Sequence, residues 1–526
     1  MQNTGSPYNL RFTDLPDFVV FNKRSGFRTH RVNENQLGLV EVLSSKIKQE
    51  LFVVHRLDKE TSGLILFAKN KTAAAALAQQ FESRDVKKTY FFLTDQTLKK
   101  SDEAITVKSH IDKVDKKFAN VLGKEDNSET KFTFVKKISD SIYLWKAEPI
   151  TGKPHQIRLH AEKIGIPVLG DHEHGGSPWF RLALHAAEIT FSFDGKTQNF
   201  KAPLPYCFEN RVELLGEFVA NEYSDLNAFM PLEKGQTYRL YHRTNQEVEI
   251  RADLYGSIIW VYWYKKDAPT EDDLSSLSEF CKKHELDYVV RHMINRGTGV
   301  GGKEQKDLYY EAAPEKWTAK EHSLIAELRR DQGFSPGLFL DQRDNRQFIK
   351  DHSKGKTALN LFSYTSLFSV AAGVGGAKQI TTVDASRTFL DWSKDNFKHN
   401  NLDPEKHEFF AQDSLLFLEG SIKRNRKWDI IICDPPSFGR TKTTTWKLDK
   451  DFPKLAKLMW SCLNGKGLIL FTCNYEKWSL NDIQKQFEKA LPKGQFKFQE
   501  LPTPDLDFEF PDAYDNLLKG LIVKKN

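Results

Sequence analysis

The sequence predicts a multidomain protein. A mainly antiparallel α+β domain is followed by a small α+β insert and an α/β doubly wound, Rossmann-like domain. Three observations lead to this prediction. The 526 residues suggest about three domains, at roughly 100 to 200 residues each. Short strands rich in β-branched and aromatic residues fill the first part of the chain. Toward the carboxyl end, apolar strands alternate with helical patterns, as they do in parallel sheets.

The composition is that of a globular protein with a mild excess of positive charge. Lys and Arg number 77 against 71 Asp and Glu, so the formal net charge is +6. This balance suits an anionic partner but does not require one. No apolar run reaches the ~18 residues of a membrane span, and the amino terminus lacks a secretory pattern, so we expect a cytoplasmic protein with no membrane partner. The five cysteines lack ligand spacing, so neither a disulfide framework nor a metal site is expected.

Residues 1–218 contain the strands of the first predicted domain. Alternating apolar runs are broken by Gly, Asn, Asp and Ser, a pattern that favours antiparallel strands. The runs are DFVVFNK, LFVVHRL, LILFAKN, TYFFLTD, IYLWKAEPI and EITFSFDG. A helix is predicted to begin near Pro154 and to be capped by Gly165. Its predicted core face, at i, i+4 and i+7, is Ile157, Ala161 and Ile164.

The remaining residues divide into three predicted segments. Apolar density falls over residues 219–236, which we expect to be a linker. Residues 237–320 combine strand patterns with the helical EDDLSSLSEFCKKHEL, which indicates a small α+β domain. In residues 321–526 the apolar strands ALNLF, QITTVD, HEFFAQD, WDIIICD and GLILFTC alternate with helical segments. This alternation predicts a doubly wound sheet.

Arg56 and Asp58 stand one residue apart in VVHRLDKETSGLILFAKN, between two apolar runs. On an extended strand they would share a face, and an arginine within ~4 to 6 Å favours the charged form of a carboxylate. Taken alone, the two residues are better explained as an ordinary ion pair at a strand end, because such exposed pairs are frequent. Arg158, on the predicted helix, likewise has the simple explanation of an i,i+4 pair with Glu162.

Six stretches, taken in order, resemble the RluA-type pseudouridine synthases over about residues 15–210. They are HRLDKETSGL, VKKTYFF, TGKPHQIRLH, GIPVLGD, LALHAAEITF and KAPLP. The resemblance implies that Asp58 is the catalytic aspartate and that Arg158 pairs with its carboxylate. It also implies that Tyr90 packs at the target base and moves a proton, although strand alternation alone would make Tyr90 a core aromatic.

The implied reaction is consistent with these residue types. Converting uridine to pseudouridine breaks the bond from N1 to C1′, turns the base and joins C5 to C1′, without any cofactor. An ionised carboxylate serves either as nucleophile or as base, and the sequence leaves both roles open. The nucleotide must first leave the RNA stack, which needs cationic side chains nearby. The resemblance gives RNA contacts to Arg56 and His155.

A second candidate site is predicted at the carboxyl ends of the parallel strands, where doubly wound sheets bind ligands. Asp384 follows the first loop by about 20 residues, a position suited to ribose hydroxyls. Asp413 also ends a strand, but a helix N-cap explains it equally well. The full set of expected cofactor-binding residues is Phe362, Ser363, Tyr364, Thr365, Asp384, Asp413 and Asp434.

The stretches DQRDNR, NLFSYTSLFSVAAGVGGAK, TTVDAS and CDPPSF resemble class I S-adenosylmethionine methyltransferases over about residues 235–526. The RlmI/RlmK-like group, which modifies large-subunit ribosomal RNA, is the most similar. The resemblance implies S-adenosylmethionine as the cofactor of this half. Where that family has Thr-Gly-Gly-Phe, this chain has Thr365, Ser366, Leu367 and Phe368, so Cβ atoms stand where backbone normally approaches the ligand.

Cys473 ends GLILFTC, on the same predicted sheet edge as Asp434. Methylation at carbon-5 of cytosine needs a thiolate to add to C6, and cytosine-C5 methyltransferases carry a cysteine at this strand end. We therefore favour cytosine C5 as the target, with Cys473 and Asp434 as catalytic residues. A buried, inert cysteine is the simpler explanation, and guanine N2 or N7 methylation without a thiol is the alternative target.

The sequence thus predicts a bifunctional, monomeric enzyme that forms pseudouridine and methylates a base in large-subunit ribosomal RNA. Transfer RNA is an alternative substrate, and no DNA partner is expected. In a further alternative, the methyltransferase half serves only as an RNA-binding module.

Overall fold

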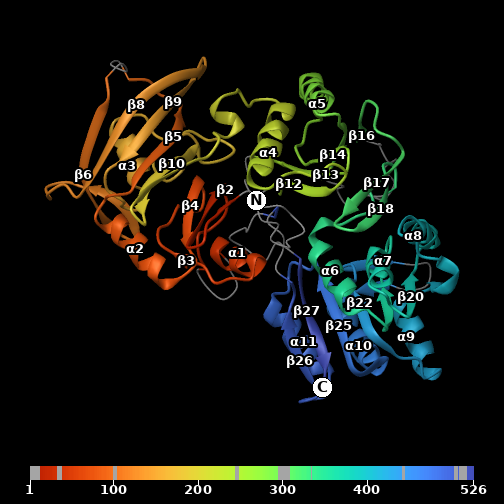
Figure 1. Cartoon of the computed structure of the whole chain (residues 1–526). Helices are drawn as coiled ribbons and strands as arrows, with labels where there is room; N and C mark the ends of the chain where they lie inside the picture. Colours follow the sequence, from red (N-terminus) through yellow and green to blue (C-terminus); the bar gives the residue numbers. More distant parts are fainter. Residues whose placement is uncertain are drawn as a thin grey trace.

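The computed structural model of the chain describes residues 12–31, 38–98, 103–242, 248–293, 308–332, 335–440, 445–502, 507–508 and 518–526. These ranges contain three large sheets, which we call the first, middle and third sheets in chain order. The middle sheet lies between the other two (Figure 1). No helix in the described ranges is long and apolar enough to cross a lipid bilayer.

The first sheet has eleven strands in the order β1-β2-β4-β10-β5-β9-β8-β6-β7, with β3 added to β4 and β11 added to β10. It is antiparallel except where β10 runs parallel to β4, which agrees with the mainly antiparallel sheet that the sequence predicts. The strands are β1 (Phe12–Asp14), β2 (Phe18–Lys23), β3 (Phe52–Val53), β4 (Ser62–Ala68), β5 (Lys87–Thr94), β6 (Ile105–Val114), β7 (Lys117–Val121), β8 (Ser128–Ser139), β9 (Ile142–Pro149), β10 (Leu184–Phe193) and β11 (Lys196–Lys201). The helices are α1 (Leu39–Ile47), α2 (Lys71–Glu82), α3 (Gln156–Lys163) and the 3₁₀ turn η1 (Tyr206–Phe208).

Helix α3 packs its apolar side on the first sheet. Ile157 and Ala161 join a buried cluster with Phe92 and Trp145 from the strands. Gly165 follows the helix with a φ of 79°, the left-handed conformation that favours glycine after a helix end. The helix therefore has the core face and the end that the sequence predicts, and its orientation is fixed by packing.

The middle sheet has five strands in the order β12-β13-β14-β15-β16. Only β14 and β15 are parallel, and helix α5 connects them. The elements are β12 (Thr237–Tyr241), β13 (Ile250–Tyr255), β14 (Ile258–Trp263), α5 (Glu271–Lys283), β15 (Asp287–His292), β16 (Leu308–Tyr309) and the hairpin β17 (Lys316–Glu321) and β18 (Leu324–Arg329).

The predicted linker at residues 219–236 needs correction, because most of it is helical. Helix α4 (Leu215–Phe229) ends inside this stretch and packs against α5. Its buried apolar residues include Phe218, Leu226 and Phe229. The Phe229 ring lies 5.0 Å from that of Phe21 on β2. Apolar residues at helical spacing mark an amphipathic helix even where their overall density is low.

Both faces of the middle sheet are buried, each against a different neighbour. On β14, Ile259 and Val261 belong to a cluster that also contains residues of the first sheet. Their neighbours Ile258 and Trp260 belong to a second cluster, shared with the third sheet. Because successive side chains of a strand point to opposite faces, the unbroken apolar run of β14 serves two cores at once.

The third sheet has seven strands in the order β21-β20-β19-β22-β25-β27-β26. The first five are parallel, and β27 is antiparallel to both of its neighbours, which confirms the predicted Rossmann-like class. The strands are β19 (Thr357–Leu361), β20 (Gln379–Asp384), β21 (Glu408–Ala411), β22 (Trp428–Cys433), β25 (Leu463–Cys473), β26 (Phe496–Glu500) and β27 (Lys519–Lys525), with a small hairpin β23 (Phe438–Arg440) and β24 (Thr445–Lys447). The helices are η2 (Leu340–Gln342), α6 (Arg343–His352), α7 (Leu367–Val374), α8 (Arg387–His399), η3 (Pro404–Lys406), α9 (Ser414–Lys423), α10 (Leu448–Ser461) and α11 (Leu480–Ala490).

Candidate active sites

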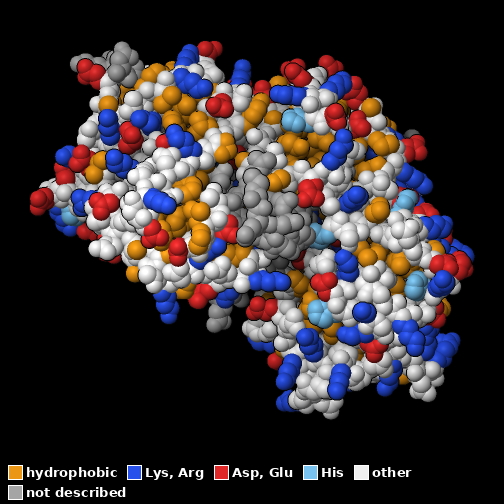
Figure 2. Space-filling view, viewed as in Figure 1, with side chains coloured by type: hydrophobic (Ala, Val, Ile, Leu, Met, Phe, Trp, Pro, Cys, Tyr) orange, Lys and Arg blue, Asp and Glu red, His pale blue; other side chains and the backbone are white. Residues whose placement is uncertain are grey.

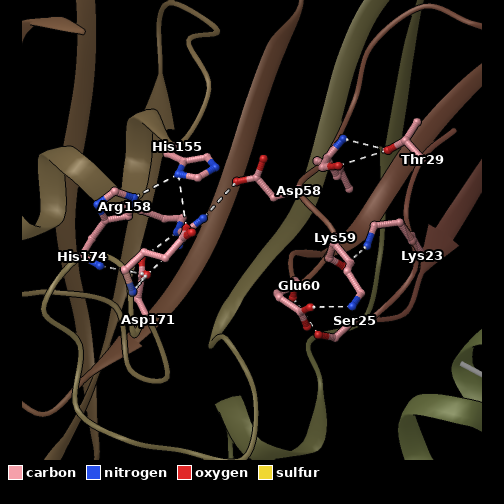
Figure 3. A network of polar contacts seen from close by, with 12 residues as sticks. Lys23, Ser25, Thr29, Asp58, Lys59, Glu60, His155, Arg158, Asp171 and His174 are labelled. Atoms are coloured by element: carbon pink, nitrogen blue, oxygen red, sulfur yellow. Dashed lines mark hydrogen bonds and ion pairs between the residues drawn. The ribbon is translucent and has the colours of Figure 1, made fainter. Parts of the chain in front are cut away.

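Asp58 lies in the irregular loop between β3 and β4, facing Arg158 on α3. The strand β3 ends at Val53, so Arg56 and Asp58 do not share a strand face as the sequence suggested. The Asp58 side chain is 25% exposed, and its Oδ2 atom lies 3.7 Å from Nη1 of Arg158. Figure 3 shows the carboxylate pointing from its loop toward the guanidinium. The predicted Asp58–Arg158 pair is therefore present, with a partly exposed carboxylate facing a buried guanidinium.

Arg158 is held by a partner that the sequence analysis missed. Asp171 accepts two hydrogen bonds from it, from Nε and Nη2, each 2.6 Å long. Glu173 accepts a further bond from Nη2 at 2.8 Å. Burial alone would lower the pKa of Arg158, but the bonds to Asp171 and the charge of Asp58 raise it above its ordinary value. The side chain therefore stays cationic and fixed beside Asp58, and it does not form the simpler pair with Glu162.

A glycine fixes the position of Asp171. Gly170 has a φ of 80°, and a Cβ atom there would lie 1.9 Å from the carbonyl oxygen of Arg181. Only glycine fits such a turn. The Gly-Asp pair after the helix in GIPVLGD was the sequence signal for this second carboxylate.

The loop that carries Asp58 is anchored through its backbone. Lys23 Nζ donates to the carbonyl oxygen of Lys59 at 2.8 Å, and Ser25 Oγ donates to that of Glu60 at 2.7 Å (Figure 3). Lys23 is buried, and burial lowers its pKa to about 7 despite the nearby charge of Glu60. These bonds fix the peptide backbone directly after Asp58.

Tyr90 lies on β5, paired in register with Ala147 and Ala186. Burial and the charge of Asp58 both raise the pKa of its phenol well above the ordinary value. The hydroxyl therefore keeps its proton at neutral pH. A phenol electrostatically coupled to Asp58 is suited to the proton-handling role that was expected, and it also contributes to the core.

The two expected RNA contacts occupy different places around Asp58. Arg56 is exposed on the same loop. His155 precedes α3, and its Nδ1 lies 3.0 Å from Nε2 of His174. Glu173 completes a group of three possible metal ligands with these histidines, but it also accepts a hydrogen bond from Arg158. Figure 2 shows Lys and Arg side chains interspersed with Asp and Glu on the face it presents, so charge alone does not mark an RNA path there.

The second site is a cavity of about 590 Å³ at the carboxyl ends of the parallel strands of the third sheet. Every expected cofactor-binding residue lines it: Phe362, Ser363, Tyr364, Thr365, Asp384, Asp413 and Asp434. The cavity is therefore where a doubly wound sheet predicts a ligand.

The loop after β19 has three residues in the left-handed conformation that favours glycine, although none of them is glycine. Phe362, Tyr364 and Ser366 have φ values of 53°, 48° and 64°. Each left-handed non-glycine residue costs about 1 kcal/mol, which the surrounding contacts must offset. Ser366 Oγ lies 2.6 Å from the hydroxyl of Ser393, and Asn396 donates to the Thr365 carbonyl at 2.9 Å. The loop thus keeps its shape although its Cβ atoms take up room near the cavity.

Asp384 and Asp413, two of the expected cofactor-binding residues, accept backbone hydrogen bonds in different places. Asp384 accepts bonds from the backbone N–H of Tyr364 at 2.9 Å and of Ser386 at 2.8 Å, and burial raises its pKa. Asp413 caps helix α9 by accepting from the N–H groups of Leu415 and Leu416. The N-cap explanation for Asp413 is therefore present in the structure, although the residue also lines the cavity.

Asp434 is the acid whose pKa shift is largest in this cavity. Its carboxylate accepts from Gln342 at 2.9 Å and from Thr472 at 2.8 Å. Burial raises the pKa of Asp434 to about 6, against the effect of these bonds. Gln342 was missed as a site residue although the DQRDNR stretch contains it. Phe438 on β23 lies between Ser437 and Gly439, which line the cavity, and its side chain is 58% exposed.

Cys473 is not positioned as the expected nucleophile. Its side chain is fully buried and is not among the residues lining the cavity, whereas the neighbouring Asn474 is. Burial raises the pKa of the thiol to about 11. Cys473 shares its strand face with Ile469 and Phe471, which pack in the core on the far side from Thr472. The catalytic role expected for Cys473 is therefore corrected to that of a core residue.

Comparisons with known proteins match two families to different parts of the chain. Residues 17–163 match the RNA pseudouridylate synthase family, and residues 306–513 match the S-adenosylmethionine-dependent methyltransferase family. The chain is 30% identical over 299 residues to a putative ribosomal RNA large subunit methyltransferase, YwbD, of Bacillus subtilis (strain 168), covering 55% of this chain and 74% of that protein. The chain belongs to the S-adenosylmethionine-dependent methyltransferase family. Residues 17–163 of the same chain match the RNA pseudouridylate synthase family, so both predicted families have a match in the chain.

Two further relatives define the extent of the similarity. The ribosomal RNA large subunit methyltransferase K/L of Pseudoalteromonas atlantica (strain T6c / ATCC BAA-1087) is 30% identical over 317 residues, which are 56% of this chain. The chain spans only 44% of the length of that relative. A structure of a putative S-adenosylmethionine-dependent methyltransferase from Streptococcus mutans superposes with a TM-score of 0.50 at 24% identity, covering 65% of this chain and 88% of the other. We call the first sheet with its helices the synthase half and the third sheet with its helices the methyltransferase half.

Proposed function

We propose that this enzyme modifies RNA twice, by isomerising uridine to pseudouridine in the synthase half and by methylating a base in the methyltransferase half. Support for the first activity comes from a solvent-accessible carboxylate, Asp58, facing a buried arginine. Support for the second comes from the cavity at the strand ends. Large-subunit ribosomal RNA is the proposed substrate, because the relatives named above are large-subunit methyltransferases. Transfer RNA is the alternative.

In the synthase half, Asp58 is the reacting group. Its carboxylate acts on the ribose of an extruded uridine, either by bonding to C1′ or by taking a ribose proton, so that the bond from N1 to C1′ breaks. Arg158 supplies the positive charge facing the carboxylate, and Asp171 prevents it from turning away. Tyr90 is the proposed carrier of the proton that leaves C5 and reaches N1 as C5 replaces N1 on C1′, and the charge of Asp58 acts on its phenol.

The cavity of the methyltransferase half fits S-adenosylmethionine. Its volume of about 590 Å³ is within the ~300 to 1,000 Å³ of small-molecule sites. Ser363 Oγ is buried there without a hydrogen-bond partner in the described part of the chain, and a bound ligand would supply one. Asp384 lines the cavity, and its carboxylate can accept hydrogen bonds from ribose hydroxyls. When bound, the cofactor supplies an electrophilic methyl group.

The surroundings of Asp434 favour an exocyclic amino nitrogen, with guanine N2 as the proposed target. An ionised carboxylate accepts a hydrogen bond from an amino group and then its proton, as the nitrogen forms its bond to the methyl carbon. It would repel the lone pair of guanine N7, which has no proton to donate. Cytosine C5 would need a thiolate, and Cys473 is buried as a thiol. The exposed ring of Phe438 is suited to stack on the base.

One experiment tests both activities. Ribosomal RNA from cells that lack this gene is incubated with the purified protein, with and without S-adenosylmethionine, and its nucleosides are analysed by mass spectrometry. Pseudouridine is expected in both samples, and N2-methylguanosine only with the cofactor. Pseudouridine that depended on the cofactor would contradict the proposed synthase mechanism. If calorimetry detects no S-adenosylmethionine binding, the methyltransferase half is only an RNA-binding module.

A further inference from the structure

We propose that a small basic hollow beside Asp58 binds a phosphate of the RNA backbone next to the target uridine. The hollow has a volume of about 340 Å³. Its lining residues are Arg28, Thr29, His30, Arg31, Arg56, Leu57 and Lys59. None of them is acidic. This inference rests on the function proposed for the synthase half and adds to it a binding site for a specific part of the substrate.

Two loops form the hollow, and a buried pair of hydrogen bonds joins them. The hydroxyl of Thr29 donates to the carbonyl oxygen of Leu57 at 3.1 Å and accepts from the N–H of Leu57 at 3.3 Å. Thr29 is 3% exposed and Leu57 is 5% exposed. Figure 3 shows the bonds of Thr29 beside the loop that carries Asp58. The residues flanking Thr29 and Leu57 are therefore held in a defined arrangement.

This junction ties the hollow to the reacting group. Leu57 is preceded by Arg56, which lines the hollow, and is followed by Asp58, which faces Arg158. Lys59, the next residue, lines the hollow again, and Lys23 holds its carbonyl oxygen. The distance from the hollow to the Asp58 carboxylate is thus fixed by one short, anchored stretch of backbone.

The charge of the hollow indicates the chemistry of its ligand. Four of its seven lining side chains are Lys or Arg. Guanidinium groups present fixed N–H donors that match phosphate oxygens. When a uridine is turned out so that its ribose reaches Asp58, its own phosphates move with it. A phosphodiester within one nucleotide of that ribose is the anion that would lie in the hollow.

The test uses the full-length protein with Arg28→Ala and Arg31→Ala combined. Binding of a short, fluorescently labelled oligouridylate is measured at increasing salt concentration. Each lost phosphate contact on a single strand should make the slope of log K against log salt shallower by about 0.7. For pseudouridine formation, KM should rise about tenfold or more, with a much smaller change in kcat. The Arg28→Lys and Arg31→Lys pair keeps both charges and should restore most of the slope.

A matched control removes two exposed lysines elsewhere in the synthase half, Lys71→Ala with Lys196→Ala. Its salt slope and KM should stay close to those of the native protein. Equal weakening by the control and the test variant would reduce the hollow to ordinary basic surface and overturn the proposal.

A second measurement identifies the source of the phosphate. A neutral methylphosphonate replaces the linkage beside the target uridine in a ribosomal RNA fragment. It should weaken binding to the native protein but have little further effect on the Arg28→Ala and Arg31→Ala variant. Inorganic phosphate that displaced RNA no better than chloride at equal ionic strength would agree with this. Binding of inorganic phosphate without any methylphosphonate effect would overturn the assignment to RNA.

The two proposals can fail separately. If the native protein forms no pseudouridine, the proposed function fails, whereas the salt slopes still decide whether the hollow contacts the RNA backbone. If pseudouridine forms and the slopes of variant and native protein coincide, only the hollow is misassigned.

Discussion

Asp58 combines exposure with fixed surroundings, as a reacting group requires. Its carboxylate is open to solvent, whereas Arg158 opposite it is 9% exposed and held by Asp171. Preorganised charge of this kind contributes to catalysis because it need not rearrange during the reaction.

Replacing Asp58 by asparagine should abolish pseudouridine formation, with a fall of about 1,000-fold or more, because an amide neither bonds to C1′ nor takes a proton. RNA affinity should change little, because the side chain keeps its size. Pseudouridine in the RNA product is measured by mass spectrometry, and binding is measured by titration. Methyl transfer by the same variant is the internal control. Substantial remaining isomerisation would move the reacting group elsewhere.

Asp434 gives the methyltransferase half an expected pH dependence. With a pKa of about 6, its carboxylate is mostly protonated below pH 6 and mostly ionised above it. Methyl transfer to an amino nitrogen needs the ionised form, so kcat should rise with pH through about 6 and then level off. In Asp434→Asn, kcat should fall about 100-fold, and this rise should disappear. An unchanged pH profile in the variant would assign the titration to another group.

Cys473 separates the two candidate target atoms. Because the thiol is buried and lies outside the cavity, Cys473→Ala should leave methyl transfer within about threefold of the native rate and lower only the stability. Removing a buried sulfur typically lowers the free energy of unfolding by about 1 to 2 kcal/mol. Loss of all methyl transfer, with S-adenosylmethionine binding intact, would restore the cytosine C5 assignment.

The residues that sequence reasoning missed are those whose contacts arise only on folding. The partners Arg158 and Asp171 lie 13 positions apart, and Gln342 lies 92 positions from Asp434, so local spacing does not reveal that these side chains pair. Cys473 is a different case. Alternation along GLILFTC places it on the face of Phe471, and Thr472 on the other, but the sequence does not say which face borders the ligand.

Helix α4 connects the synthase site to the middle sheet. Its Glu222 pairs with Arg24 at 3.1 Å, and its Asp225 pairs with Arg181. Arg181 also donates to the hydroxyl of Ser62, four residues after Asp58. All of these side chains are largely buried. The helix therefore contributes to the position of the catalytic loop from outside the first sheet.

Asp225→Asn should remove the counter-charge of Arg181 and lower the kcat of pseudouridine formation by about tenfold. An uncompensated buried charge also costs about 3 kcal/mol of folding stability, so rates are compared well below the unfolding temperature. KM and the affinity for S-adenosylmethionine should remain unchanged, and Asp225→Glu should recover part of kcat. The matched control is Glu285→Gln, which breaks the exposed pair with Lys234. A parallel loss of both enzymatic activities would indicate a purely structural role for the helix.

At the scale of elements, strand and helix patterns predict the fold class, but they do not predict helix α4, which lies between the first and middle sheets in the chain. Period-two alternation and the βαβ rhythm come from short-range side-chain directions, which the sequence displays directly. The sequence of helix α4 resembles a linker because polar residues interrupt the apolar ones that pack on Phe21 and its neighbours. Those polar residues include Glu222 and Asp225, whose partners are Arg24, directly after β2, and Arg181, shortly before β10.

The whole molecule is held together by the middle sheet, which shares one core with each half. We therefore expect heat to unfold the chain in a single calorimetric transition. S-adenosylmethionine should raise the temperature of that entire transition, because a ligand of the native state stabilises the whole cooperative unit. The aromatic fluorescence and the loss of pseudouridine activity should follow the same curve. Two separate transitions, of which only one responds to the cofactor, would show that the halves are energetically independent.

The two-faced strand β14 also has a consequence for biosynthesis. When residue 218 leaves the ribosome, the apolar side chains of Phe21 and its neighbours are still exposed. Some of the residues that later pack on them, up to Val290, have not yet emerged. At ~5 to 20 residues per second, those 72 further residues take roughly 4 to 14 s. During this interval the nascent chain exposes an apolar surface. We therefore expect chaperones that act at the ribosome to bind it.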